Sequence, residues 1–282
     1  MSGRELTISG AMVETLGIGL ARLDAQLLLA HVMEQSRTWL LTHDDATMSD
    51  EQVARFRELI ARRAAGEPFA YLVGEREFHG LSLAVGPAVL VPRPDTETLV
   101  DWALEILHDD AGDSPAVLDL GTGSGAIALA LKRGCASARV WAAERSSDAL
   151  AVARANAARL GLDVAFAQGD WWGALAGAAG VPVFDLVVSN PPYIAADDPH
   201  LADLAHEPLA ALVAADAGLA DIRAIAAAAH GRLRRGGRLL FEHGWQQADA
   251  VAAILADAGF CGIATRRDIE GRPRCTGGVL GA

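Results

Sequence analysis

The residues with the most distinctive chemistry are Asn190, Pro191, Pro192 and Tyr193, which follow the apolar run 184–189. Proline has no backbone N–H, so the two prolines must lead the chain out of a sheet. Their carbonyl groups then lack local partners, while Asn190 adds a side-chain carbonyl and Tyr193 an aromatic face. Two acceptors beside a ring suit a planar group that carries an NH2. A turn that only ends the strand is the alternative.

A glycine-rich loop follows an apolar strand in the segment DLGTGSGAIALAL, 119–131. Glycine permits a sharp turn and lets a ligand come close to the backbone. The pattern fits a nucleoside cofactor, although a tight turn without a ligand is the alternative. A carboxylate just before the loop suits a cationic ligand such as S-adenosylmethionine better than a pyrophosphate. The predicted cofactor-binding residues here are Asp119, Gly121, Thr122, Gly123, Ser124 and Gly125.

Two further predicted strand ends carry side chains that suit a nucleoside. Glu144 lies about twenty residues past the loop, where an acidic residue commonly accepts the ribose hydroxyls. Asp170 can receive an adenine amino group, and Trp171 can cover the ring by stacking. An exposed charge at a strand end is the alternative for Glu144, and Trp172 fits a place in the core. Asn190 borders this predicted cofactor site.

The elements that must position these residues alternate between helix and strand. Apolar runs predict strands over 116–121, 139–144, 163–170, 184–190 and 236–244, with two more beyond 259. Helical patterns cover 96–107, 124–133, 148–160, 216–233 and 245–258. Such alternation is typical of an α/β fold with a mostly parallel sheet covered on both faces. In this fold the ligand lies at the carboxyl ends of the strands.

The N-terminal part of the sequence has a different pattern. Residues 1–72 predict a small helical bundle, in which Ser49 caps a helix whose apolar face includes Phe56. Residues 73–94 alternate and then break at glycine and proline, which predicts a short β-hairpin linker. We therefore expect an N-terminal helical domain over 1–72, the linker over 73–94, and a catalytic domain over 95–282.

The composition narrows the class of protein. A net charge of −12 disfavours a duplex nucleic-acid binder, which commonly presents a basic face. The cysteines form no CxxC pair and the histidines lack metal-ligand spacing, so we expect no metal and assign His79 and His243 structural roles. No signal peptide and no membrane span are predicted. We expect a cytoplasmic monomer without a nucleic-acid or membrane partner.

Nearly the whole sequence resembles the PrmC/HemK family of release factor glutamine methyltransferases. The matching segments include EPFAYLVGEREFHGL (67–81), LVPRPDTETLVDWAL (90–104), SNPPYI (189–194), EPLAALVAADAGLADI (207–222) and LLFEHGWQQ (239–247). The resemblance implies a class I, Rossmann-like methyltransferase domain and a helical N-terminal domain that helps to recognise release factors. It also implies methyl transfer from S-adenosylmethionine to the side-chain amide nitrogen of glutamine in the GGQ motif of these factors, with S-adenosylhomocysteine as product.

The resemblance also implies roles for residues. Asn190, Pro191, Pro192 and Tyr193 become the catalytic and substrate-binding segment, and Arg93 and Glu97 line the approach of the substrate. Three features depart from the family pattern. One is the tail CTGGVLGA (275–282), which is less typical of the family. Glu144 stands where the family often has aspartate, and the segment around His206, which covers the cleft in the family, looks slightly short.

Three other classes of protein fit part of the pattern. A nucleic-acid methyltransferase acting on adenine or guanine needs the same grip on an NH2 group. A release-factor-binding module without activity could retain the same fold. A dinucleotide dehydrogenase would use the glycine loop but has no need of Asn-Pro-Pro-Tyr. For the methyltransferase, we expect direct transfer driven by alignment, without a cysteine or histidine relay.

Overall fold

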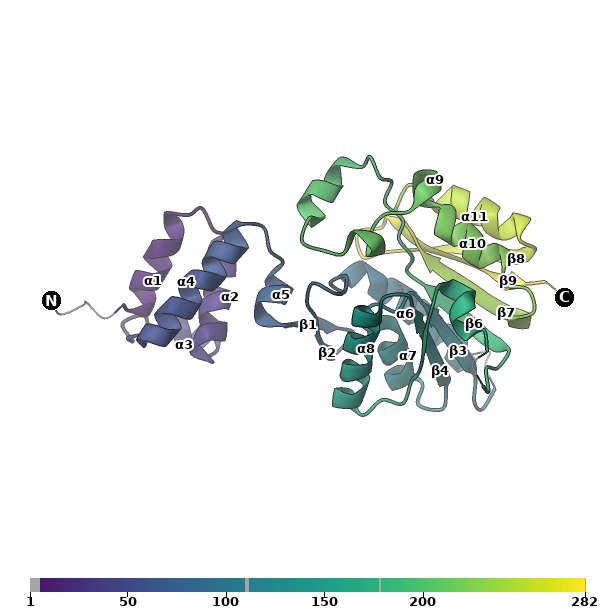
Figure 1. The fold of residues 1–282 in the computed structure, drawn as a ribbon, viewed down its shortest axis with the longest axis horizontal. Coiled ribbons are helices and arrows are strands. Elements are labelled where there is room, and N and C mark those ends of the chain that lie inside the picture. The colour runs from purple at the N-terminus through teal and green to yellow at the C-terminus, as the bar shows by residue number, and fades with distance from the viewer. Residues whose placement is uncertain (1–5, 110–111, 178, 282) are drawn as a thin grey trace. The chain divides into compact units, whose positions relative to one another are not determined.

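The computed structural model describes residues 6–109, 112–177 and 179–281. The chain divides into two compact units, Met1–Glu75 and Arg76–Ala282. Figure 1 shows helices in the first unit and a sheet with covering helices in the second.

The N-terminal unit is built from the helices α1 (Ile8–Leu16), α2 (Arg22–Met33), α3 (Arg37–Thr42), α4 (Asp50–Ala64) and α5 (Phe69–Val73). The predicted start of α4 is confirmed: the Ser49 hydroxyl accepts from the Gln52 N–H, and the Gln52 side chain accepts from the Ser49 N–H. This capping box satisfies two N–H groups that a helix start leaves without partners. Phe56 and Leu59 of α4 are fully buried, so the amphipathic face supplies the core of this unit.

The predicted hairpin is confirmed over β1 (Glu75–Phe78) and β2 (Leu81–Ala84), and all of it except Glu75 belongs to the second unit. Residues 85–93 are irregular and lead into the 3₁₀ turn η1 (Pro94–Thr96) and helix α6 (Glu97–Asp109). The hairpin is fastened to the rest of the unit by Asn156, whose side chain bonds both the N–H and the carbonyl of Ala84.

The central sheet of the described residues has seven strands in the order β5-β4-β3-β6-β7-β9-β8. The strands are β3 (Ala116–Leu120), β4 (Arg139–Glu144), β5 (Ala165–Gln168), β6 (Phe184–Ser189), β7 (Leu233–Glu242), β8 (Phe260–Arg267) and β9 (Pro273–Leu280). Strands β3 to β7 pair in parallel, and β9 runs antiparallel to β7 and β8. Sequence order reverses at β3, so the switch point lies between β3 and β6.

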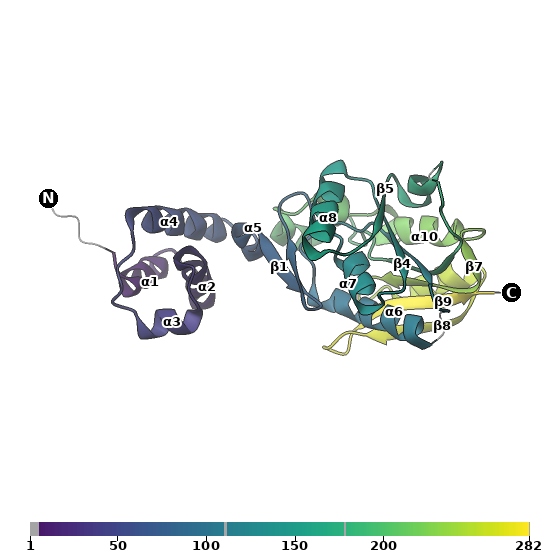
Figure 2. The ribbon, with the colours of Figure 1, turned by 90° about the horizontal axis from the view of Figure 1, so that it is seen from below.

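Helices cover both faces of this sheet, as expected of an α/β fold (Figures 1 and 2). One core joins α6 and α7 (Ala126–Gly134) to one face, with a contribution from α8 (Ser147–Leu160). The other core joins α10 (Ala220–Ala227) and α11 (Ala248–Asp257) to the opposite face. Val117 lies in the first core and Leu118 in the second, because successive side chains of a strand point to opposite faces.

The predicted helix over 216–233 is wrong. The segment forms α9 (Ala215–Gly218) and α10, with left-handed backbone at Asp216, Ala217 and Gly218, and β7 already begins at Leu233. Alanine favours a helix, but tertiary contacts override that preference here. A Cβ atom on Gly218 would lie 2.0 Å from the Tyr193 carbonyl oxygen, so the chain must bend where it passes the Asn190–Tyr193 segment.

Candidate active site

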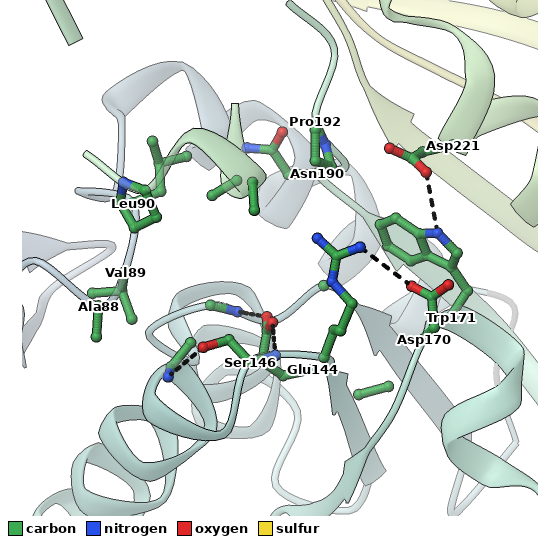
Figure 3. Close-up of a pocket in the computed structure, with 18 of the residues that line it drawn as sticks. Ala88, Val89, Leu90, Glu144, Ser146, Asp170, Trp171, Asn190, Pro192 and Asp221 are labelled. Atoms are coloured by element: carbon green, nitrogen blue, oxygen red, sulfur yellow. Dashed lines mark hydrogen bonds and ion pairs between the residues drawn. The ribbon is translucent and has the colours of Figure 1, made fainter. Parts of the chain in front are cut away.

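The carboxyl ends of three neighbouring strands bring the predicted residues together. Leu120 of β3 is in register with Ala143 of β4 and with Ser189 of β6. The residues that follow each strand end therefore meet at one edge of the sheet. They border a cavity of about 260 Å³ (Figure 3). The predicted site residues that line it are Gly121, Gly123, Glu144, Asp170, Trp171, Asn190 and Pro192.

Backbone hydrogen bonds fix the glycine loop against the end of β4. The N–H groups of Gly121 and Thr122 both donate to the Ala143 carbonyl, at 2.9 and 3.0 Å. Gly121 has a φ of 78°, which strains any residue with a side chain. A Cβ atom there would also lie 3.1 Å from the Trp171 ring, which borders the same cavity. Glycine therefore lets the loop and the indole close one end of the cavity.

Asp119 lies beneath this loop rather than in the cavity wall. It is fully buried, and one carboxylate oxygen accepts from the Thr122 hydroxyl at 2.6 Å and from the Ala128 N–H at 3.2 Å. The other oxygen, Oδ1, has no hydrogen-bond partner within the described chain. Burial raises the pKa of Asp119 to about 7, with a smaller contribution from the charge of Glu144. Thr122 and Ser124 of the loop are buried too. Like Asp119, they lie outside the cavity lining and help to hold the loop in place.

Glu144 is held at the cavity wall by two backbone groups. Its Oε2 accepts from the Gly123 N–H and its Oε1 from the Ser146 N–H, both at 2.9 Å. A carboxylate has about four lone-pair positions, so both oxygens retain capacity to accept from hydroxyl groups in the cavity. Through the bond to Gly123, Glu144 connects the end of β4 to the glycine loop.

The end of β5 supplies a carboxylate, which pairs with an arginine from the end of β4, and an indole. Asp170, which is largely exposed, lies 4.0 Å from the Arg145 guanidinium. The Trp171 Nε1–H donates to Asp221 Oδ1 at 3.2 Å, as Figure 3 shows. Trp172 is buried and donates to the Ile225 carbonyl, in agreement with a place in the core.

Asp221 and Arg145 are cavity residues that the sequence did not single out. Asp221 belongs to α10 and lies 50 residues after Trp171, so no short spacing links the two in the sequence. Burial foremost, and the charge of Asp170 in addition, raise the pKa of the Asp221 carboxyl.

The segment after β6 presents only part of itself to the cavity. The Ser189 hydroxyl donates to the Leu120 carbonyl at 2.7 Å, which ties β6 to β3 at the site. Asn190 and Pro192 line the cavity, whereas Pro191 is buried and Tyr193 lies outside the lining. The Tyr193 hydroxyl instead donates to Glu242 at 3.3 Å. The structure therefore brings the amide of Asn190, but not the ring of Tyr193, to the cavity.

Arg93 and Glu97 lie outside the cavity lining as well. Arg93 is bonded to the buried carboxylate of Glu207, which also accepts from the Val91 N–H at 3.0 Å. Glu97 accepts from the His79 N–H at 2.9 Å and so fastens the hairpin turn. Glu207 thereby joins two segments that both border the cavity, residues 88–90 and the stretch from Pro208 to Val213.

The segment after His206 lines the cavity in spite of its departure from the family pattern. Pro208, Ala210 and Ala211 border the cavity. The segment is anchored by Ile194, whose N–H donates to Leu212 and whose carbonyl accepts from Ala214.

The two histidines singled out in the sequence make internal contacts. His243 is fully buried and bonds the Thr276 hydroxyl at 2.7 Å, while His79 bonds Asp101 at 2.9 Å. Across the described ranges no cluster of potential metal ligands occurs. In the same ranges no helix combines the length and the apolar character needed to cross a membrane.

Comparison with family models finds a match within each unit. The PrmC N-terminal domain matches residues 10–74, and the methyltransferase small domain matches residues 99–215. Two solved structures share the fold. A methyltransferase from Pyrococcus furiosus has a TM-score of 0.52 and 17% identity, over 83% of this chain and 100% of that one. A T. thermophilus 16S rRNA methyltransferase in complex with AdoMet and guanosine has a TM-score of 0.52 and 20% identity, over 73% of this chain and 49% of that one.

Closer relatives cover almost the entire length. The chain is 51% identical to the release factor glutamine methyltransferase of Bordetella pertussis over 93% of this chain and 96% of that protein. The protein of the same name from Escherichia coli is 45% identical over 90% of this chain and 91% of its own length. With this identity and coverage, the chain belongs to the family of release factor glutamine methyltransferases.

Proposed function

We propose that this chain transfers the methyl group of S-adenosylmethionine to the side-chain amide nitrogen of the glutamine in the GGQ motif of peptide chain release factors. The names of the relatives support the substrate. The observation that carries the proposal is the position of Asn190. Its Nδ2 donates to the Thr96 hydroxyl at 3.3 Å, so its amide oxygen is the acceptor that it offers in the cavity beside the glycine loop.

The cofactor half of the cavity suits S-adenosylmethionine. Residues 121–125 cradle it, Glu144 accepts from the ribose hydroxyls, and Trp171 covers the adenine beside Asp170. The unpartnered buried oxygen of Asp119 leaves negative potential under the loop, which suits a cationic ligand. When bound, the cofactor supplies a methyl group activated by a sulfonium centre.

The acceptor half must hold a poor nucleophile, because the lone pair of an amide nitrogen is shared with its carbonyl. The Asn190 amide oxygen and the Pro191 carbonyl accept the two hydrogens of the NH2, and Pro192 packs against its plane. Alignment of this kind can supply roughly 7–11 kcal/mol of a barrier. The same two acceptors stabilise the positive charge that develops on the nitrogen.

The N-terminal domain, residues 1–72, recognises the release factor in this proposal. It matches the PrmC N-terminal domain, and it exposes apolar side chains that a partner can cover, including Val13, Leu16 and Leu41. Release factors act in translation, so we place the protein in the cytoplasm. We expect it to act as a monomer.

The test uses labelled S-adenosylmethionine with three acceptors: a release factor, its GGQ variant with Gln→Ala, and DNA. We expect label on the wild-type factor alone, on the glutamine nitrogen. Label on DNA would identify an amino methyltransferase of nucleic acid instead. Label that persists on the Gln→Ala factor would assign the methyl group to another atom.

A further inference from the structure

A buried carboxylate lies behind the Asn190–Tyr193 segment, and the proposed reaction makes no use of it. Glu242 is the last residue of β7 and is 1% exposed. Its Oε1 accepts from the Tyr193 hydroxyl at 3.3 Å. Its Oε2 has no hydrogen-bond partner within the described residues. Burying a charge costs free energy, so the interactions of Glu242 must offset this cost.

Thr96 connects this carboxylate to Asn190. Thr96 is 4% exposed, and its Oγ1 accepts from Asn190 Nδ2 at 3.3 Å. Burial raises the pKa of Glu242, and the Thr96 hydroxyl opposes this by favouring the ionised carboxylate. A hydroxyl that accepts from an amide N–H can turn its own proton toward a carboxylate. The direction of donation therefore runs from Asn190 through Thr96 to Glu242.

This direction decides which atom of the Asn190 amide faces the cavity. An amide can flip, and in the flipped orientation its NH2 would meet the substrate NH2, donor against donor. The Glu242 carboxylate can only accept a hydrogen bond, so the Thr96 hydroxyl donates its proton toward Glu242. The Thr96 oxygen is then left to accept from Asn190. We propose that Glu242 is a positioning residue that acts through Thr96 and Tyr193 to hold the Asn190 amide oxygen toward the acceptor nitrogen. The inference rests on the proposed function, which supplies that nitrogen.

The backbone of Tyr193 is held as well as its hydroxyl. Gln247 Nε2 donates to the Tyr193 carbonyl and to the Ala217 carbonyl, each at 3.0 Å. Gln247 Oε1 accepts from the Gly244 N–H at 2.8 Å, which fixes the orientation of that side chain. Glu242 and Gln247 thus hold both ends of Tyr193 from the end of β7 and the turn that follows it.

The charged and titratable groups around Glu242 come from three elements. Arg274 of β9 favours its ionised form, and Asp95 of η1 opposes it. These two neighbours form an ion pair with each other at 3.0 Å. Cys275 of β9 and Tyr193 are also near the carboxylate: burial foremost, and the charge of Glu242 in addition, raise the pKa of both. Burial is the largest effect and raises the pKa of Glu242 to about 7. We therefore expect the turnover to rise with pH through this value.

The experiment compares Glu242→Gln, Thr96→Val and Thr96→Ser with the wild type. The control is Glu105→Gln, which changes an exposed glutamate of α6 paired with Arg266. We expect Glu242→Gln and Thr96→Val to lower kcat about ten- to hundredfold, while the Kd of S-adenosylmethionine stays within about twofold. Thr96→Ser keeps the hydroxyl and restores most of the activity. The rise of kcat with pH disappears in Glu242→Gln, and Glu105→Gln behaves like the wild type.

A second readout does not depend on activity. The side-chain NH2 resonances of Asn190, assigned by their loss in Asn190→Ala, should shift with pH around about 7 in the wild type and stay constant in Glu242→Gln. A kcat equal to that of the wild type, together with Asn190 resonances that still shift with pH as in the wild type, in Glu242→Gln and Thr96→Val would overturn the inference. Equal losses in Thr96→Val and Thr96→Ser would do the same. If the wild type fails to methylate a release factor, the proposed function is wrong, and the resonances alone decide the inference.

Discussion

Asp119 and Glu242 are two buried carboxylates in one domain, one beneath the cofactor half of the cavity and one behind the acceptor half. Each is almost fully buried, each has one oxygen without a partner in the described chain, and burial raises the pKa of each to about 7. They differ in what they hold. Asp119 bonds Thr122 and Ala128, its near neighbours in sequence, whereas Glu242 bonds Tyr193, which is 49 residues away.

The difference shows two ways of building a site. The cofactor half is shaped by a continuous loop, whose glycines and backbone bonds a short motif can encode. The acceptor half is assembled from η1, the end of β6 and the end of β7, and depends on side chains that meet only in the folded chain. We therefore expect changes near Asp119 to act on cofactor binding, and changes near Glu242 to act on turnover.

The largest expected effect is on how the free energy of unfolding depends on pH. A raised folded pKa means that the native state holds its proton more tightly, so the contribution to stability is full below the unfolded pKa and is lost as pH rises through about 7. Over the window from about pH 4 to about pH 8, the loss amounts to roughly 4 kcal/mol for Asp119 and roughly 3 kcal/mol for Glu242. Urea unfolding of Asp119→Asn and Glu242→Gln should show a correspondingly smaller fall of the unfolding free energy. A fall as steep as in the wild type would show that the carboxyls are not buried as described.

The next effect concerns the bend that passes Tyr193. Gly218→Ala combines a φ of 84° with a Cβ atom 2.0 Å from the Tyr193 carbonyl oxygen, so we expect a loss of about 3 kcal/mol in unfolding free energy. Gly161→Ala is the matched control: its φ is 65° but no heavy atom lies within 4 Å of the added Cβ, so the loss should be about 1 kcal/mol. Equal losses in urea unfolding would contradict a close approach at Tyr193.

A smaller effect is expected for a residue of the cofactor half, whose change should weaken cofactor binding without changing turnover. Asp221→Asn replaces the charged acceptor of the Trp171 Nε1–H with a neutral one, which we expect to cost about 1 kcal/mol of cofactor binding, or roughly fivefold in Kd. Calorimetry with S-adenosylmethionine measures this. The turnover of release factor at saturating cofactor should stay near the wild-type rate. A normal Kd combined with a lowered kcat would place Asp221 with the acceptor half instead.

The smallest effect is expected for the capping box of α4, which lies in the N-terminal unit and far in sequence from the site residues. Ser49→Ala removes the capping box of α4 and should destabilise the N-terminal unit by about 1 kcal/mol. Protection of α4 amides from hydrogen exchange measures this loss. Cofactor affinity, a property of the other unit, should not change.

The sequence was informative wherever local chemistry decides the structure. Alternating strands and helices, the glycine loop and the cap at Ser49 are continuous patterns, so the fold and the cofactor half could be read from them. The helix predicted over 216–233 failed because alanine propensity carries no information about the Tyr193 carbonyl that bends the chain. Asp221 and Glu242 were missed as site residues because they reach the site from elements remote in sequence. Arg93 and Glu97, which were expected to line the approach of the substrate, lie outside the cavity lining and each bond a neighbouring segment, so their role stays a prediction.

The most direct test of the account is the behaviour of Asn190→Ala. We expect this variant to bind S-adenosylmethionine with a normal Kd, because the loop and Glu144 are untouched. Methylation of the release factor glutamine should fall about 10²- to 10³-fold, as expected when one group aimed at the developing charge is lost. Normal cofactor binding together with near wild-type methylation would contradict the central claim that Asn190 holds the acceptor amide.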